Sequence, residues 1–594
     1  MTTPARRHGA QRPRITALAH AICALAFCID VAAQTTLSLP QLQPLGPPPV
    51  PRENRLSEAN VLLGKTLFWE EQLSRTGTVA CGTCHRPMWS GTDPRTALSP
   101  ATSTNPGPNA VFGDDDDVLG SAGVPQHRAD GAYVESAAFG FGPSVGGRKS
   151  PSAINAAFAP ELFWDGRAGG TFRDPETGTI LIAQGGALEN QALGPLVDTA
   201  EMGHAGNTII TVGERIVAAR PLALASDVPG TLSQWIAGRG YPALFQEVFG
   251  TPRISAARIA MAIASYERTL IANRTPLDAE LSGTPSLTAL ERRGAEVFVQ
   301  HDCAQCHGGA QLTDNLFHNI GVRPAAEDPG RQARTGNPAD LGAFRTPALR
   351  DVAQRPPFMH DGSLATLEAV VDFYDRGGDF AAPNKSPLIR PLRLTPADKA
   401  ALLAFLRRPL TDARVAAELP PFDRPTLFTE SARVPVHAPL PRPNAALSRL
   451  LGRLETPAAQ RRAAADAPRP TATTRAAVPG GSGHSPTIVA LEPPLIGNTN
   501  FTVVLAHARG GARATLVVAA ADPGIHAVLP FRNGISIEVF TDGDALDDGD
   551  VSAQLSLDQP GWEGRTFFAR FYVEDPGARR GLAVSEAVRF TVHR

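Results

Sequence analysis

Four of the six cysteines in this 594-residue chain lie in two copies of one motif, Cys-x-x-Cys-His. The copies are Cys81/Cys84/His85 and Cys303/Cys306/His307. This spacing attaches a haem through two thioether bonds, and the histidine then ligates the iron. The alternative is a zinc ion held by the two cysteine pairs, but a zinc site does not require a histidine directly after each pair. The sequence therefore predicts two covalently bound haem c groups.

Residues 1–34 have the pattern of a secretory signal peptide. Arginines precede a mostly apolar stretch from Ile15 to Ala26, and Ala32-Ala33-Gln34 offers a small-residue cleavage region. The apolar stretch is short for a bilayer span, and thioether attachment of haem requires export. We therefore expect a periplasmic protein that is not an integral membrane protein. A formal net charge of −2 gives no indication of nucleic-acid binding.

The rest of the chain is expected to be mainly α, with two c-type cytochrome haem domains followed by a linker and a C-terminal β-sandwich accessory domain. Apolar residues recur with helical spacing at 254–272, 287–300, 364–375 and 396–407. Alternating or continuous apolar runs between Gly, Asp and Pro turns begin after residue 500. The predicted boundaries are 35–275 and 276–415 for the haem domains, 416–484 for the Pro/Ala/Arg-rich linker and 485–594 for the sandwich.

Several blocks resemble those of the bacterial di-haem cytochrome c peroxidase and MauG superfamily, in the same order. Beside the two haem motifs they are Leu73-Ser-Arg-Thr-Gly, Arg148-Lys-Ser-Pro-Ser-Ala-Ile-Asn, Phe163-Trp-Asp-Gly-Arg-Ala, Gln191-Ala-Leu-Gly-Pro, Glu201-Met, Phe344-Arg-Thr-Pro-Ala-Leu-Arg and His360-Asp-Gly. The resemblance covers about residues 55–410. It implies an enzyme that uses hydrogen peroxide, and it says nothing about the C-terminal domain.

The resemblance also assigns roles to individual residues. Trp164 matches the tryptophan that lies between the two haems and relays electrons. Gln191 and Glu201, ten residues apart, match the polar pair over the peroxidatic haem. Glu201 would act there as acid and base while the peroxide bond breaks. Without the resemblance, Trp164 would be interpreted as an ordinary core residue, and Gln191 and Glu201 as ordinary surface residues.

The distal ligand of the second haem is the feature closest to MauG. In the peroxidases a Met lies 14 residues after the His of the His-x-Gly block, and counting from His360 gives Tyr374 here. MauG also has Tyr at this position, and a tyrosinate would favour oxidised iron. Met359 is the alternative ligand. We expect Tyr374 to share a helix face with Leu367, Val370 and Val371.

Two positions depart from the peroxidase pattern. Phe141 stands where those enzymes carry a distal His on the first haem, which predicts an open iron site, with upstream His127 as an alternative ligand. Lys149 replaces the Asn that binds a calcium ion between the haems, and an ammonium cannot ligate calcium. Calcium, which would also use the carbonyls of Arg355 and Pro357, is therefore expected to bind weakly or not at all.

The preferred function is oxidation of a remote substrate, such as a protein side chain, by peroxide through both haems. A peroxide scavenger fed by a small cytochrome or cupredoxin is the runner-up among enzymes. Related peroxidases are often dimers, so a homodimer is also open. The alternative from another class is a non-catalytic di-haem electron-transfer cytochrome that docks through its β-domain.

Overall fold

The computed structural model describes residues 42–430, apart from 129–132 and 207, and residues 477–592, apart from 491–493, 495–500 and short loop stretches between 528 and 563. The predicted signal peptide and most of the predicted linker lie outside the described residues. In the described parts, no helix has the length and apolar character needed to cross a membrane.

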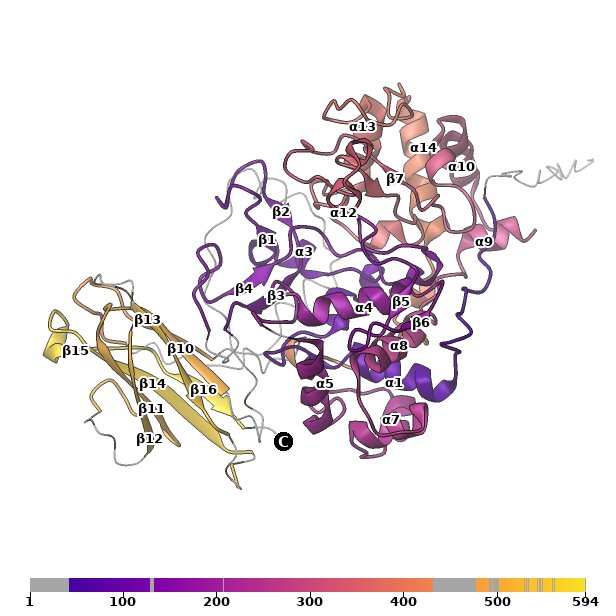
Figure 1. Cartoon of the computed structure of the whole chain (residues 1–594). Helices are drawn as coiled ribbons and strands as arrows, with labels where there is room; N and C mark the ends of the chain where they lie inside the picture. Colours follow the sequence, from indigo (N-terminus) through magenta and orange to yellow (C-terminus); the bar gives the residue numbers. More distant parts are fainter. Residues whose placement is uncertain are drawn as a thin grey trace, which may run out of the picture. The chain divides into compact units, whose positions relative to one another are not determined.

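Helices form the framework around the first motif, as the sequence predicts (Figure 1). They are α1 (Glu58–Phe68), α2 (Cys81–Cys84), α3 (Arg95–Leu98), α4 (Ala187–Val197), α5 (Ile209–Ala218), α6 (Gly230–Ile236), α7 (Tyr241–Phe249) and α8 (Ala256–Glu267). The strands here are short antiparallel pairs, β1 (Thr104–Asn105) with β2 (Val118–Leu119), β3 (Ala122–Pro125) with β4 (Pro143–Val145), and β5 (Phe172–Arg173) with β6 (Ile180–Ile182). Ser57 caps α1, with its hydroxyl oxygen accepting the Asn60 amide at 3.2 Å.

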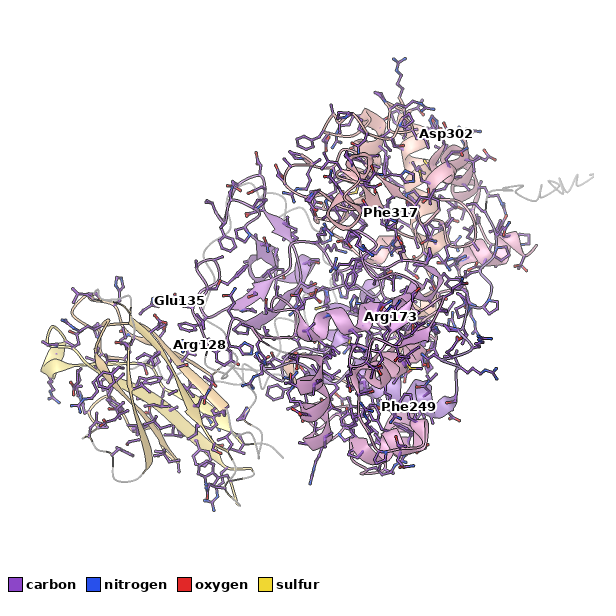
Figure 2. The ribbon with its side chains drawn as sticks, viewed as in Figure 1. Arg128, Glu135, Arg173, Phe249, Asp302 and Phe317 are labelled. Carbon is purple, nitrogen blue, oxygen red and sulfur yellow. The ribbon has the colours of Figure 1, made fainter. Side chains whose placement is uncertain are left out.

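A second, smaller set of helices surrounds the second motif. These are α9 (Pro276–Leu281), α10 (Ala289–Gln300), α11 (Cys303–Cys306), α12 (Gln332–Thr335), α13 (Leu367–Arg376) and α14 (Pro396–Leu406), with one strand pair, β7 (Phe317–His318) and β8 (Phe344–Arg345). The short α15 (Ala413–Ala416) that follows packs through Val415 into the core of the first region. Thr395 caps α14, with its hydroxyl oxygen accepting the Asp398 amide at 3.1 Å. Asp302, the residue directly before α11, has a left-handed backbone conformation, and Figure 2 labels it together with Phe317 on β7.

Each haem region is built on one pair of helices that cross at a glycine. A Cβ on Gly64 of α1 would lie 1.9 Å from the carbonyl oxygen of Ala262 on α8. A Cβ on Gly294 of α10 would lie 2.0 Å from the carbonyl oxygen of Ala401 on α14. Any larger side chain would push either pair apart. The two glycines therefore set the distance between the two helices of each pair, and each pair supports one motif.

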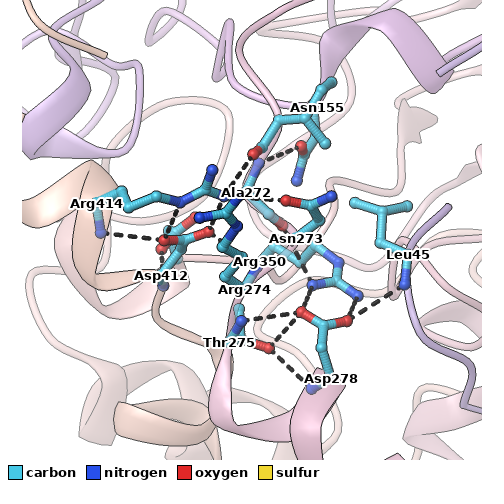
Figure 3. A network of polar contacts seen from close by, with 12 residues as sticks. Leu45, Asn155, Ala272, Asn273, Arg274, Thr275, Asp278, Arg350, Asp412 and Arg414 are labelled. Atoms are coloured by element: carbon cyan, nitrogen blue, oxygen red, sulfur yellow. Dashed lines mark hydrogen bonds and ion pairs between the residues drawn. The ribbon is translucent and has the colours of Figure 1, made fainter. Parts of the chain in front are cut away.

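A buried polar network joins segments that are far apart in the chain (Figure 3). Asp278 accepts two hydrogen bonds from the Arg350 guanidinium, both of 2.8 Å, and a third from the Leu45 amide at 3.2 Å. Arg350 also donates to the carbonyl of Ala272 at 3.2 Å. The Ala272 amide in turn donates to the Asn155 side chain at 2.9 Å. This network fixes the segment after α8 against the block that contains Arg350.

The C-terminal region folds into two antiparallel sheets. One has the order β13-β10-β9, and the other has the order β12-β11-β14-β15, with β16 also paired to β14. The strands are β9 (Thr487–Ala490), β10 (Phe501–Ala508), β11 (Arg513–Ala519), β12 (Gly534–Phe540), β13 (Gly549–Leu555), β14 (Thr566–Glu574), β15 (Leu582–Val584) and β16 (Val588–Thr591). Inward side chains of both sheets, such as Val503 and Phe571, share one apolar core. This is the packing of a sandwich.

Candidate functional site: two haem cavities

The first motif forms a single helical turn that places its residues beside a cavity. α2 carries Cys81 and Cys84, and His85 follows at the end of the turn. The Nδ1 atom of His85 lies 2.9 Å from the carbonyl oxygen of Gly91. Burial lowers the pKa of His85, so the neutral imidazole is favoured. A neutral ring that donates through Nδ1 keeps the Nε2 lone pair for a metal, as an axial haem ligand requires.

The structure brings Gln191 and Glu201 to the cavity of this motif. Both side chains line it together with Cys81, Cys84 and His85, and the cavity measures about 30 Å³. Gln191 lies on α4, and Glu201 lies in the turn that follows that helix. Burial, aided by the Asp198 carboxylate, raises the pKa of Glu201 to about 7. A carboxyl group with this pKa exchanges protons readily at neutral pH.

Glu267 and Met202 also line the first cavity, and no role was predicted for either side chain from the sequence. Glu267 ends α8, and burial raises its pKa to about 8. Its Oε2 atom is buried without a hydrogen-bond partner among the described residues. The sequence does show that Glu267 is unusual, because it follows Ile259 and Ile263 at four-residue intervals and so places a carboxylate on an apolar helix face. The second residue, Met202, is buried and brings a thioether to the same cavity.

Neither Phe141 nor His127 is among the described residues that line the first cavity. The His127 Nδ1 atom lies 2.9 Å from the carbonyl oxygen of Pro125. Its ring packs against Tyr133 and His204, with ring centroids 5.2 and 5.0 Å away. In this arrangement His127 is part of a local aromatic group, not a side chain facing the first motif.

The second motif repeats the local geometry of the first. α11 carries Cys303 and Cys306, and the Nδ1 atom of His307 lies 3.1 Å from the carbonyl oxygen of Leu312. Burial lowers the pKa of His307 to about 4, which keeps the ring neutral. The motif borders a cavity of about 240 Å³. Most of the lining is apolar, as expected for a porphyrin site.

Tyr374 and Met359, the two candidates for the distal ligand, both line the second cavity. Tyr374 lies on α13, and Val370 and Val371 of the same helix line the cavity as well. Burial raises the pKa of the Tyr374 hydroxyl. Met359 has a left-handed backbone with φ of 71°, which is unusual for a residue with a side chain.

Trp164 also lines the second cavity, beside His360. The two rings meet edge to face, with centroids 6.3 Å apart. The indole N–H of Trp164 donates to the carbonyl oxygen of Lys149 at 2.7 Å. Lys149 is itself buried, and burial together with the nearby Arg355 lowers its pKa to about 7. Trp164 is thus held by the hydrogen bond that it donates to a block preceding it in the chain.

The donor sets fit two haem groups and do not fit one four-cysteine zinc ion. The two cysteine pairs line separate cavities that share no residue. Among the described residues, one group of three metal-ligating side chains is close together, Cys306 with Asp314 and His318. Its cysteine belongs to the second haem motif.

Comparison with known proteins agrees with this geometry. Residues 58–286 match the di-haem cytochrome c peroxidase family, and residues 291–408 match the cytochrome c family. The chain is 31% identical over 363 residues to the methylamine utilization protein MauG of Methylorubrum extorquens, a match that covers 60% of this chain and 80% of that protein. It is 30% identical to the cytochrome-c peroxidase IdrP1 of Denitromonas iodatirespirans over 66% of this chain and 91% of that protein.

Among solved structures, a MauG-like protein associated with microbial copper homeostasis is 29% identical, with a TM-score of 0.45. That match covers 64% of this chain and 96% of the other. The sequence matches establish the class of protein, an oxidoreductase built on cytochrome c haem domains. The chain belongs to the di-haem cytochrome c peroxidase and MauG family.

Proposed function

We propose that this family member reduces hydrogen peroxide at the cavity of the first motif and passes the oxidising equivalents to the second. The observation that carries the proposal is that Gln191 and Glu201 line the cavity of the first motif while Trp164 lines that of the second. Two bound haem c groups would supply the redox chemistry, and His85 and His307 would hold their irons. The family membership supports a peroxidase activity.

The polar pair of the first cavity would manage protons. Glu201, with its pKa raised to about 7, takes a proton from the incoming peroxide and returns one to the leaving oxygen. Gln191 provides a neutral amide in the same cavity that orients the peroxide by hydrogen bonding. The cavity is small, so both groups act within a short distance of the bound molecule.

Trp164 would provide the aromatic bridge between the two sites. Its indole is held by the hydrogen bond to Lys149 and by edge-to-face contact with His360. At the second cavity Tyr374 would help His307 to hold the haem iron, with Met359 as the alternative. A phenol oxygen is a harder ligand than a thioether, so Tyr374 would favour the oxidised state of the site.

We also propose a cellular location, an electron source and a domain division for this protein. The pattern of residues 1–34 supports export to the periplasm, where a small cytochrome, a cupredoxin or a protein substrate would supply electrons. Haem domains over 35–275 and 276–415, the linker over 416–484 and an accessory sandwich over 485–594 remain the proposed division of the chain. Homodimer formation is a further expectation from the resemblance.

A peroxide titration of the haem-loaded protein tests the proposal. Fully oxidised protein is mixed with increasing hydrogen peroxide while the visible spectrum is recorded. We expect a spectral change that saturates at about one equivalent without prior reduction. A need for half-reduction before any reaction would favour the scavenger fed by a small redox protein. An unchanged spectrum in both the oxidised and half-reduced protein would overturn the peroxidase proposal.

One observation favours the alternative of an electron-transfer cytochrome. The Met202 side chain lines the first cavity, and a methionine sulfur is a common sixth ligand in electron-transfer cytochromes. Ligation by Met202 would close the site to peroxide. The spin state of the oxidised protein separates the two functions, because a low-spin first haem that becomes high-spin in Met202→Leu would identify Met202 as the ligand.

A further inference from the structure

Lys149 lies at a meeting point of three segments of the chain. Its amide donates to the carbonyl oxygen of His360 at 2.8 Å, and its own carbonyl accepts the indole N–H of Trp164 at 2.7 Å. Its buried Nζ atom donates to the carbonyl oxygen of Arg355 at 3.1 Å. A single residue thus connects the tryptophan block with the stretch from Arg355 to His360.

The neighbouring residue holds this position firmly. The Arg148 guanidinium donates to Asp165 at 2.8 Å, next to Trp164 in the chain. It also donates to both oxygens of Asp328, at 2.6 Å each. Arg148 is partly buried, so these pairs are better shielded from solvent than surface ion pairs. The ion pairs of Arg148 with Asp165 and Asp328 therefore fix the backbone next to Lys149, independently of the contact that the Lys149 side chain makes with Arg355.

The resemblance to the peroxidases implies a calcium ion in this region, and the residues present do not fit one. Calcium takes about six to eight oxygen ligands at roughly 2.3–2.6 Å. The side chain at position 149 ends in a nitrogen and supplies no oxygen ligand. The carbonyl oxygen of Arg355, one of the expected ligands, already accepts the Lys149 amine. A calcium ion bound to that carbonyl would have to displace the amine from a buried site.

We propose that the Lys149 side chain takes the place of the calcium ion of related enzymes and ties the Arg355 segment to the Trp164 block without a metal. Lys149 then acts as a positioning residue for both segments. The proposal goes beyond the peroxidase function and does not depend on it, because the calcium content of the haem-loaded protein is measurable whatever the protein oxidises.

Elemental analysis and calorimetry of the full-length haem-loaded protein test the idea. The probe is calcium chloride, added after treatment with EGTA and removal of the chelator. We expect the native protein to contain no stoichiometric calcium, to show no binding heat and to keep its melting temperature in EGTA. Lys149→Asn restores the amide oxygen, so this variant should bind one calcium ion per chain and melt at a higher temperature when calcium is added.

Lys149→Met is the matched control, since it has similar length but neither an amine nor an oxygen ligand. It should bind no calcium, and calcium should not change its melting temperature. One tightly held calcium ion per native chain, or a melting temperature of the native protein that falls in EGTA, would overturn the proposal. So would a Lys149→Asn variant that carries both haems by mass yet takes up no more calcium than Lys149→Met. If that variant does not fold, the calcium content of the native protein decides the question by itself.

Discussion

Glu201 has the surroundings of a proton acceptor that works near neutral pH. Burial and the Asp198 carboxylate raise its pKa to about 7, against an ordinary glutamate value near 4.5. Only the deprotonated form can take a proton from peroxide, so the rate of the peroxide reaction should rise with pH. With a pKa of about 7, the deprotonated fraction grows about tenfold between pH 6 and pH 8. An unperturbed glutamate would give a flat profile over this range.

Glu201→Gln keeps the shape of the side chain and removes its titration. General acid–base catalysis by one positioned group is worth roughly 10²–10⁴-fold in rate. We therefore expect the second-order rate constant for peroxide to fall by about this factor and to lose its rise between pH 6 and pH 8. Stopped-flow absorbance of the oxidised protein mixed with excess peroxide measures both. Asp198→Asn serves as a control, because loss of the neighbouring charge should move the midpoint to lower pH and leave the plateau rate unchanged.

A Glu201→Gln protein with the rate and pH profile of the native protein would contradict this role of Glu201. Glu267, whose pKa is raised to about 8 in the same cavity, is the rival group. A larger loss in Glu267→Gln than in Glu201→Gln would transfer the proton role to Glu267. In that case the midpoint of the native profile should lie nearer pH 8 than pH 7.

Three further predictions concern the second cavity and the buried polar network around Asp278. Trp164→Phe loses the 2.7 Å hydrogen bond to Lys149 and should slow oxidation of the electron donor far more than the reaction with peroxide. Steady-state rates measure the first reaction and stopped-flow rates the second. Equal losses in both rates would mean that Trp164 has only a structural role. Tyr374→Phe should change the visible spectrum of the second haem, whereas an altered spectrum in Met359→Leu alone would transfer the ligand role. Arg350→Met leaves Asp278 as a buried, unpaired carboxylate, so the free energy of unfolding in guanidinium should fall by about 3–5 kcal/mol; a loss below 1 kcal/mol would contradict this.

Features that depend on short stretches of the chain were predicted from the sequence alone. Haem attachment depends on the spacing within each Cys-x-x-Cys-His motif, so both motifs can be recognised without knowledge of the fold. Helices whose apolar spacing is regular were also predicted, with α10 at Ala289–Gln300 inside the expected 287–300. The β-strands after residue 500 followed from alternation and turn residues, because each strand faces one apolar core shared by both sheets.

Long-range relations needed the tertiary structure. The apolar pattern predicts a helix over 254–272, but α8 stops at Glu267, and the backbone beyond it is bonded to Asn155 through Leu270 and Ala272. Glu267 was missed because its position on a helix face does not say which cavity that face borders.

The same holds for Lys149. The sequence shows that an ammonium stands in place of an asparagine, but only the fold shows that its nitrogen reaches the Arg355 carbonyl. Residues more than two hundred positions apart meet there because packing, and not spacing along the chain, decides which groups become neighbours.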